Sequence, residues 1–333
     1  MYDSTSVFIA PELSDKSEDT AKLPDSWEII DYSFGDEKTQ IIRAPALIDN
    51  SMSKITYFTG FKTDLHDYNI PRFRALQQVG ISIDLVLLPD PGRSTDFLDA
   101  QCKLVKSVLS KAPPPGHFDD SQQHYIFGHS LGARAILSNL TEPDFAATMY
   151  DVYTGGILIA PHITSPFRSN PIMRYAYPLY SKMVSNKHNG EGFLDWAFPT
   201  AVKVKNLLMR RETESDFNQT FKIGSLPPPT HGQIIHSVYE GEALEAELKD
   251  ADISDYAKAF PLAMIGGDLD FVSDVEAIER VAAIFEATFQ SFDAHHNPFL
   301  QSRAARQFIM EQMSLMALER GPDFPSLDHM PML

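Results

Sequence analysis

The sequence is poor in cysteine and in positive charge, and it has no long apolar run. Its 333 residues include one cysteine, Cys102, which excludes an intramolecular disulfide and a zinc site built on thiolates. Lysine and arginine number 28 against 45 aspartates and glutamates, for a formal net charge of -17. Such a chain repels phosphate backbones, so nucleic acid is not expected as a partner. No apolar stretch approaches the ~18 residues of a membrane span, so we expect no integral membrane segment.

Two further absences concern targeting and cofactors. The amino terminus lacks the basic region followed by an apolar run that marks a secretory signal, so we expect a cytoplasmic protein. The H-E-x-x-H spacing of zinc enzymes is absent as well, and we expect neither a metal nor another cofactor. What remains is an ordinary globular composition with 43% hydrophobic residues.

Short apolar runs alternate with stretches of helical periodicity along much of the chain. Such alternation predicts a mostly parallel sheet with helices on both faces, and therefore the α/β class. A hairpin is expected before it, over 27–32 and 40–43. The expected strands are 55–59, 83–88, 124–127, 156–160, 262–265 and 288–292, and the expected helices are 70–79, 96–110, 131–140, 273–287 and 299–319.

The alternation stops at about residue 164 and resumes at about residue 259. The roughly 95 residues between these points are too many for a loop inside a compact sheet. They are rich in aromatic residues and methionine, which suits an apolar substrate but equally suits the core of the segment itself. We expect a core formed by 27–163 and 259–320, and an inserted, mostly helical cap over 164–258.

The segment Gly128-His129-Ser130-Leu131-Gly132 matches the pattern G-x-S-x-G. Composition alone would produce this pattern in about one chain in ten of this length. Here it follows an expected buried strand and opens an expected helix, which is the context that a nucleophilic serine on a sharp turn requires. The turn would expose the Ser130 hydroxyl, and the N–H of Leu131 at the helix start would point at a developing oxyanion.

With this motif the chain resembles the α/β-hydrolase family, over roughly residues 27–320. The resemblance implies a triad in the chain order serine, acid, histidine. Members commonly carry Gly-x-x-Asp-x-x-Val at the acid, which maps onto Gly267, Asp270 and Val272 with one residue fewer. Asp270 is the candidate acid by this resemblance, and Asp268 is the alternative.

The resemblance also suggests the base and the second oxyanion donor. His296-Asn297-Pro298-Phe299-Leu300 is similar to the His-x-x-Phe-Leu stretch of the family, so His296 is the candidate base and His295 the alternative. The family usually has His-Gly-x after the strand expected at 55–59, where this chain has Thr59-Gly60-Phe61. The Phe61 N–H is the expected second donor, because Gly60 permits the turn that aims it inward.

The resemblance implies hydrolysis of a carboxylic ester through an acyl-enzyme. Ala160-Pro161-His162-Ile163 followed by a cap is similar to the lysophospholipase and monoacylglycerol-lipase branch, so a small-molecule acyl ester is the expected substrate. The same triad would also serve a thioesterase, an acyltransferase or a carbon–carbon hydrolase. Dehalogenases and epoxide hydrolases of this fold are disfavoured, since they carry aspartate in place of Ser130. A ligand sensor that turns over slowly or not at all is the alternative from another class.

Overall fold

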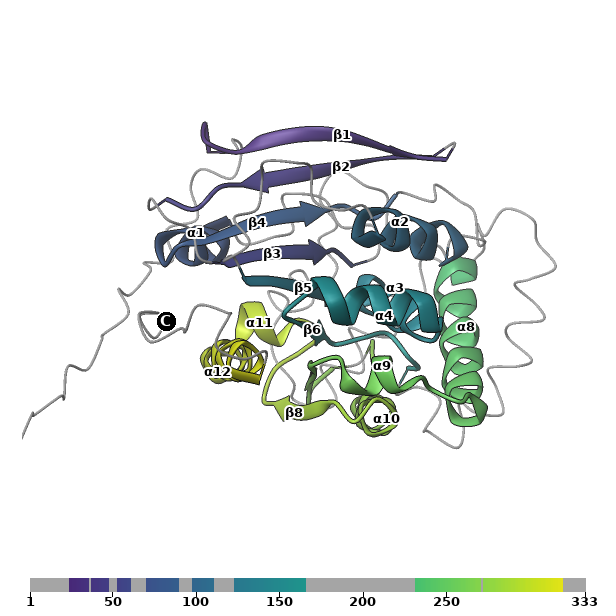
Figure 1. Ribbon diagram of the computed structural model, residues 1–333. Coiled ribbons are helices and arrows are strands. Elements are labelled where there is room, and N and C mark those ends of the chain that lie inside the picture. Colours follow the sequence, from purple (N-terminus) through teal and green to yellow (C-terminus); the bar gives the residue numbers. More distant parts are fainter. Residues whose placement is uncertain are drawn as a thin grey trace, which may run out of the picture.

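A mostly parallel sheet of eight strands forms the centre of the computed structural model, which describes residues 24–35, 37–47, 53–60, 70–89, 98–110, 123–165, 231–270 and 272–319. The strand order is β1-β2-β4-β3-β5-β6-β7-β8 (Figure 1). β2 pairs antiparallel with β1 and with β4, and every other pair is parallel. The strands are β1 (Glu28–Phe34), β2 (Glu37–Ala44), β3 (Ser53–Phe58), β4 (Ile81–Val86), β5 (Gln123–His129), β6 (Gly155–Ile159), β7 (Leu262–Gly267) and β8 (Thr288–Phe292).

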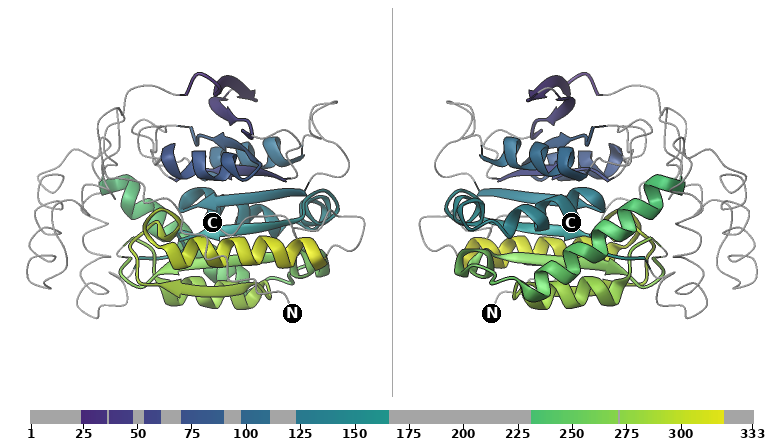
Figure 2. Two further views of the ribbon diagram at one scale, coloured as in Figure 1. Left: turned by 90° about the vertical axis from the view of Figure 1, so that its left-hand side faces the viewer. Right: turned by 90° about the vertical axis from the view of Figure 1, so that its right-hand side faces the viewer.

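Helices cover both faces of this sheet. α1 and α12 pack on one face, and α2, α3, α4 and α10 pack on the other, as the views in Figures 1 and 2 show. The expected α/β class with a mostly parallel sheet is therefore confirmed. The described helices are α1 (Ile70–Gln78), α2 (Leu98–Ser110), α3 (Leu131–Leu140), α4 (Pro143–Val152), α8 (His231–Asp250), α9 (Asp255–Ala259), α10 (Val275–Ile284), α11 (Pro298–Gln301) and α12 (Arg303–Glu319).

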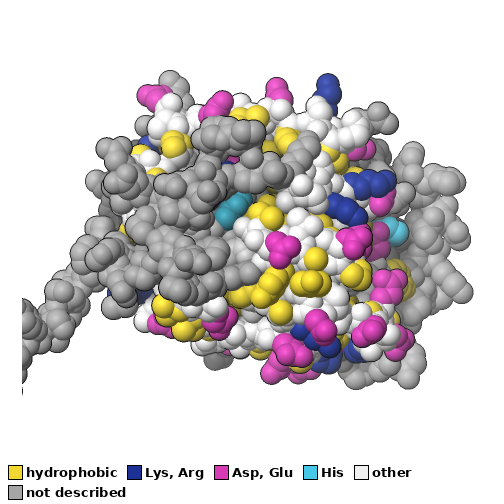
Figure 3. Space-filling view, viewed as in Figure 1, with side chains coloured by type: hydrophobic (Ala, Val, Ile, Leu, Met, Phe, Trp, Pro, Cys, Tyr) yellow, Lys and Arg dark blue, Asp and Glu magenta, His cyan; other side chains and the backbone are white. Residues whose placement is uncertain are grey.

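The surface of the described residues reflects the excess of acidic side chains. On the face shown in Figure 3, carboxylates lie among hydrophobic and uncharged groups, with fewer lysines and arginines between them. Exposed ion pairs such as Lys103 with Asp99 on α2 add little stability, because water screens both charges. None of the helices in the described ranges is both long and apolar enough to cross a membrane.

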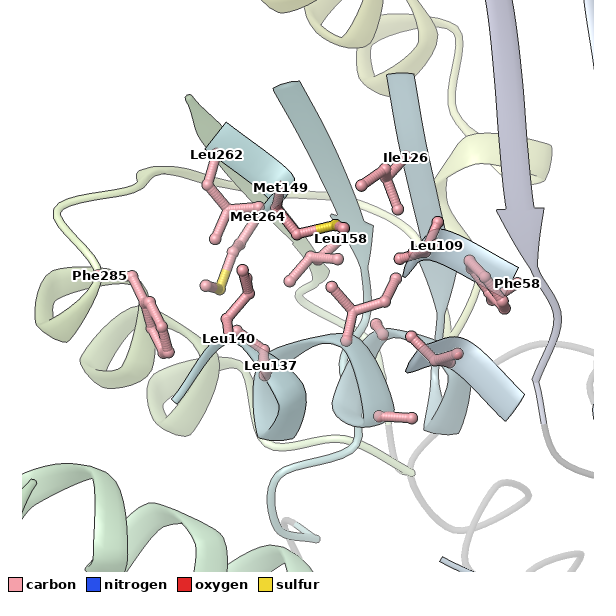
Figure 4. Close-up of a cluster of buried hydrophobic side chains, with 14 of the residues drawn as sticks. Phe58, Leu109, Ile126, Leu137, Leu140, Met149, Leu158, Leu262, Met264 and Phe285 are labelled. Carbon is pink, nitrogen blue, oxygen red and sulfur yellow. The ribbon is translucent and has the colours of Figure 1, made fainter. Parts of the chain in front are cut away.

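The larger apolar cluster lies between the sheet and the helices α2, α3, α4 and α10. Figure 4 shows its strand side chains, among them Ile126, Leu158 and Met264, pointing at side chains such as Leu137 and Met149 from the helices. All seven residues of β5 are buried, as expected for a central parallel strand that is covered on both faces. This packing fixes the carboxyl end of β5, where the G-x-S-x-G segment begins.

A second apolar cluster lies on the opposite face, under α1 and α12. Aromatic side chains meet there, and the rings of Tyr57 and Phe73 contact edge to face with centroids 5.6 Å apart. Phe299 of α11 joins them, with its ring centroid 6.1 Å from that of Phe73. The start of the last helical segment is thereby anchored directly after the loop that carries His295 and His296.

The carboxy-terminal helices differ in detail from the expectation. The helix expected over 299–319 is two helices, because Ser302 is extended (φ -112°, ψ 124°) and its Oγ accepts from Ala305 N to begin α12. The helix expected over 273–287 is α10, which begins at Val275. Asp274 is its cap, accepting from Glu276 N at 3.0 Å. Ser273 is buried and donates to Ala160 O.

One helix was not expected, and part of the predicted cap lies outside the described residues. α4 begins with Pro143, a residue favoured in the first turn, and this signal could have revealed it.

Of the predicted cap, residues 166–230 are not described. The structure does describe α8 and α9, and Leu244 and Leu248 of α8 belong to the larger apolar cluster. The division into core and cap stays a prediction.

Candidate active site

Ser130 lies on the turn between β5 and α3, in a strained conformation. Its φ is 53° and its ψ is -115°, a region that non-glycine residues rarely adopt. A Cβ on Gly128 would lie 2.7 Å from Ala133 Cα, and one on Gly132 would lie 2.4 Å from Thr59 O. Both glycines of the motif are therefore needed for close backbone approach. Ser130 N donates to Ile159 O at 2.9 Å, which ties the turn to β6.

Asp270 lies in the turn that follows β7. Its Oδ1 accepts from Val272 N at 2.7 Å and from Ser273 N at 3.1 Å. These two amides hold the carboxylate in one orientation. Its side chain is 1% exposed, and the remaining oxygen, Oδ2, is directed at His296.

His296 follows β8 and joins the other two side chains. Its Nδ1 lies 2.8 Å from Asp270 Oδ2, and its Nε2 lies 2.9 Å from Ser130 Oγ. A carboxylate only accepts, so Nδ1 carries the proton and donates to Asp270. Nε2 is then the bare nitrogen, and it accepts from the Ser130 hydroxyl. This arrangement can take the hydroxyl proton as the serine attacks.

The alternative acid, Asp268, and the alternative base, His295, have other surroundings. Asp268 is exposed at the end of β7, and its backbone N–H donates to Phe292 O. His295 Nδ1 lies 3.3 Å from Leu269 O, and the His295 N–H donates to Gln301 Oε1 at 2.8 Å. The structure therefore brings Asp270 and His296 to Ser130, and it does not bring Asp268 or His295 to the hydroxyl.

Two further histidines surround the three side chains. His129 Nε2 donates to His296 O at 3.1 Å, and this bond helps to fix the backbone of the candidate base. Burial lowers the pKa of His129 to about 3, and it lowers the pKa of His162 well below its usual value. Both rings are therefore neutral at physiological pH, and neither places a positive charge beside His296.

Of the two expected oxyanion donors, one lies within the described residues. Leu131 is the first residue of α3, where amides have no acceptor within their own helix. Phe61 lies outside the described residues, although Gly60 before it is buried. The close contact of Gly132 with Thr59 O places this strand end against the start of α3. Thr59 Oγ1 accepts from Leu88 N at 3.0 Å and so joins the ends of β3 and β4.

No protein-family model and no curated protein matches the sequence. Solved structures do match. One is a soluble variant of monoglyceride lipase from Saccharomyces cerevisiae in complex with a substrate analogue, with a TM-score of 0.58 and 14% identity over 90% of this chain and 99% of the other. A thermostable carboxyl esterase from Bacillus coagulans gives 0.54 and 14%, over 90% and 99%. An α/β-hydrolase from Penicillium sp. sh18 gives 0.53 and 14%, over 89% and 99%.

The chain has the α/β-hydrolase fold. In this fold the three candidate side chains follow β5, β7 and β8, at the carboxyl ends of these parallel strands. Within the described ranges, no group of three or more His, Cys, Asp or Glu side chains is placed to hold a metal. The three candidate side chains of this α/β-hydrolase sheet supply a hydroxyl, an imidazole and a carboxylate.

Sequence reasoning missed the groups that fix the candidate residues in place. Arg134, one turn after Ser130, is buried completely, and its guanidinium contacts Ser237 and Glu240 of α8. A charged residue on the buried face of an expected apolar helix was the available signal. His162, which has no role by sequence reasoning, also contacts α8, since its Nε2 lies 3.2 Å from Ser237 Oγ.

Proposed function

We propose that this protein is a carboxylic-ester hydrolase that acts through an acyl-enzyme intermediate. The observation that carries this proposal is the unbroken hydrogen-bonded path from Ser130 Oγ through His296 to Asp270 Oδ2. Ser130 is the nucleophile, His296 the general base, and Asp270 the acid that fixes the imidazole and stabilises its protonated form. The path supports attack on an acyl carbon because it carries the hydroxyl proton away during bond formation.

The reaction has two steps with balanced proton movement. In the first, Ser130 Oγ bonds to the acyl carbon while its proton moves to His296 Nε2, and the proton is then passed to the departing alcohol oxygen. In the second, water gives a proton to the same nitrogen and attacks the acyl-enzyme, which releases the carboxylic acid and restores the Ser130 hydroxyl. The oxyanion formed in each step accepts from the Leu131 and Phe61 N–H groups in this proposal.

An acyl ester of the lysophospholipid or monoacylglycerol kind is the proposed substrate class. The resemblance of the segment 160–163 to that branch supports it, as does the fold shared with a monoglyceride lipase and a carboxyl esterase. An acyl thioester, or transfer of the acyl group to an acceptor other than water, would use the same three side chains. The test below therefore includes a thioester.

The test is hydrolysis of p-nitrophenyl esters from acetate to palmitate, and of an acyl thioester, by wild type and by Ser130→Ala. Wild type is expected to turn over, and the variant to lose about a thousandfold or more of kcat. The preferred chain length measures the acyl pocket. Full activity in the variant would contradict the role of Ser130. A wild type that is stabilised thermally by an ester analogue but shows no turnover would favour the ligand sensor.

A further inference from the structure

The carbonyl of Ser130 is held by two amides from different segments. Arg134 N donates to it at 3.0 Å from within α3, and His162 N donates to it at 3.2 Å from the segment after β6. Together with the bond from Ser130 N to Ile159 O, these bonds define the strained turn. The orientation of the hydroxyl therefore depends on where Arg134 and His162 lie.

The side chains of these two residues converge on one residue of α8. Arg134 Nη1 donates to Ser237 O, and His162 Nε2 lies 3.2 Å from Ser237 Oγ. Arg134 Nη2 also donates to Glu240 Oε2 at 3.0 Å. Ser237 is buried, so both contacts lie away from water. One serine on α8 thus binds both residues whose amides hold the Ser130 carbonyl.

Because Arg134 is charged and buried, its guanidinium requires the acceptors that Ser237 and Glu240 of α8 provide. The guanidinium is completely buried, and desolvation lowers its pKa to about 10, while the Glu240 carboxylate acts in the opposite direction. A buried cation that loses its acceptors is strongly destabilising. α8 must therefore be docked whenever Arg134 holds its place beneath the nucleophile turn.

α8 also touches the segment 160–165 through its backbone. A Cβ on Gly241, one turn after Ser237, would lie 1.8 Å from Ile163 O. The segment 160–165 in turn contacts the loop of the candidate acid, since Ser273 Oγ donates to Ala160 O and Asp274 N donates to Thr164 O at 2.8 Å. Movement of α8 would therefore reach both the serine and the acid.

We propose that Ser237 is a positioning residue: from α8 it holds Arg134 and His162, and through their amides it sets the geometry of Ser130. This inference rests on the proposed function, because it concerns the nucleophile of that reaction. Ser237 acts on the serine and not on the substrate. Ser237→Ala removes the Oγ contact with His162 and keeps the backbone carbonyl that accepts from Arg134. Through the His162 amide on the Ser130 carbonyl it should lower kcat, and it should leave KM and folding almost unchanged.

The test compares Ser237→Ala with wild type in the full chain, by two kinetic readouts and one control for folding. The first readout is kcat and KM for a p-nitrophenyl ester. The second is the rate at which a fluorophosphonate bonds to Ser130 Oγ with loss of fluoride, which does not depend on the acyl pocket. We expect both kcat and the labelling rate to fall about ten- to a hundredfold, as small misplacements of reacting groups do. Far-ultraviolet circular dichroism and Tm report the folded fraction.

Two more variants sharpen the result. Gly241→Ala should lower the same two rates, because its methyl group displaces α8 from Ile163. Ser314→Ala is the matched control, since Ser314 Oγ donates to Met310 O within α12, and it should leave both rates unchanged. The proposal is overturned if Ser237→Ala keeps wild-type rates, or if its rates fall only in proportion to its folded fraction. If the fluorophosphonate does not label wild type, Ser130 is not a reactive nucleophile. That outcome would contradict the proposed function itself, and the positioning role with it.

Discussion

Ser130 and Ala160 both have positive φ values, 53° and 43°, and they directly follow the neighbouring strands β5 and β6. Such conformations cost about 1–3 kcal/mol each and persist where the surroundings fix them. Here the fixing bonds are identifiable, because Ser130 N donates to Ile159 O and Ala160 N donates to Ile265 O. At the scale of the residue, two of the three described non-glycine residues with positive φ thus lie at the candidate site, and the third, Glu286, lies in the turn after α10.

The clearest prediction for a single residue concerns the two neighbouring aspartates. Asp270→Asn should lower kcat by about a thousandfold or more, because an amide can donate to His296 Nδ1 and stabilise the wrong tautomer. Asp268→Asn is the matched control and should be nearly silent, since Asp268 is exposed. Steady-state kinetics on an ester substrate measures both. A larger loss in Asp268→Asn than in Asp270→Asn would exchange their roles.

At the scale of the element, helix ends connect the sheet to the candidate site. α10 begins directly after the acid loop, with Asp274 as its cap, while Ser273 stays free to bind Ala160 O. α3 begins directly after Ser130, so its first amides and its positive dipole end lie beside this candidate nucleophile. Each helix start is therefore both a structural junction and a boundary of the site.

The cap of α10 gives a prediction of stability. Asp274→Ala should lower the free energy of unfolding by about 1 kcal/mol, because Glu276 N loses its acceptor. Asp293→Ala, at an exposed loop position, is the matched control and should stay within about 0.5 kcal/mol of wild type. Urea unfolding monitored by circular dichroism gives both values. Equal effects in the two variants would show that Asp274 does not stabilise the helix.

At the scale of the whole molecule, buried neutral histidines link stability to pH. Burial lowers the pKa values of His124 and His129 to about 3 and that of His162 well below its usual value. The unfolded chain therefore binds more protons than the folded chain between about pH 6.5 and pH 3. Stability must fall as the pH falls through this window, by up to about 1.4 kcal/mol per pH unit for each such histidine.

His124 tests this linkage away from the candidate site, because it lies at the start of β5 and its Nε2 contacts Thr56 Oγ1 at 2.9 Å. Wild type should lose stability to urea between pH 7 and pH 5. His124→Gln removes one titrating group and should lose less over the same interval, even if it is less stable at pH 7. An identical pH dependence in both proteins would mean that His124 does not contribute to the acid sensitivity.

The sequence by itself determined the class of fold and pointed to Ser130 as the candidate nucleophile. Strand and helix periods reflect which faces of each element are buried, so the alternation was enough to predict a mostly parallel α/β sheet. The turn at Ser130 could be found because its requirements are local: a buried strand, two glycines at fixed spacing and a helix start. The acid and the base were each narrowed to a pair of candidates by resemblance to a known family.

Only the tertiary structure decided which member of each pair faces Ser130. Asp268 and Asp270 follow the same strand, and the turn closed by Asp270 N and Gly267 O directs one of them at His296. Ser130 and His296 are 166 positions apart, and Arg134 and Ser237 are 103 apart. Patterns of hydrophobicity and turn chemistry reach over a few residues. Contacts at these separations depend on how the packed elements stack, and this is why the docking of α8 on Arg134 left no readable pattern in the sequence.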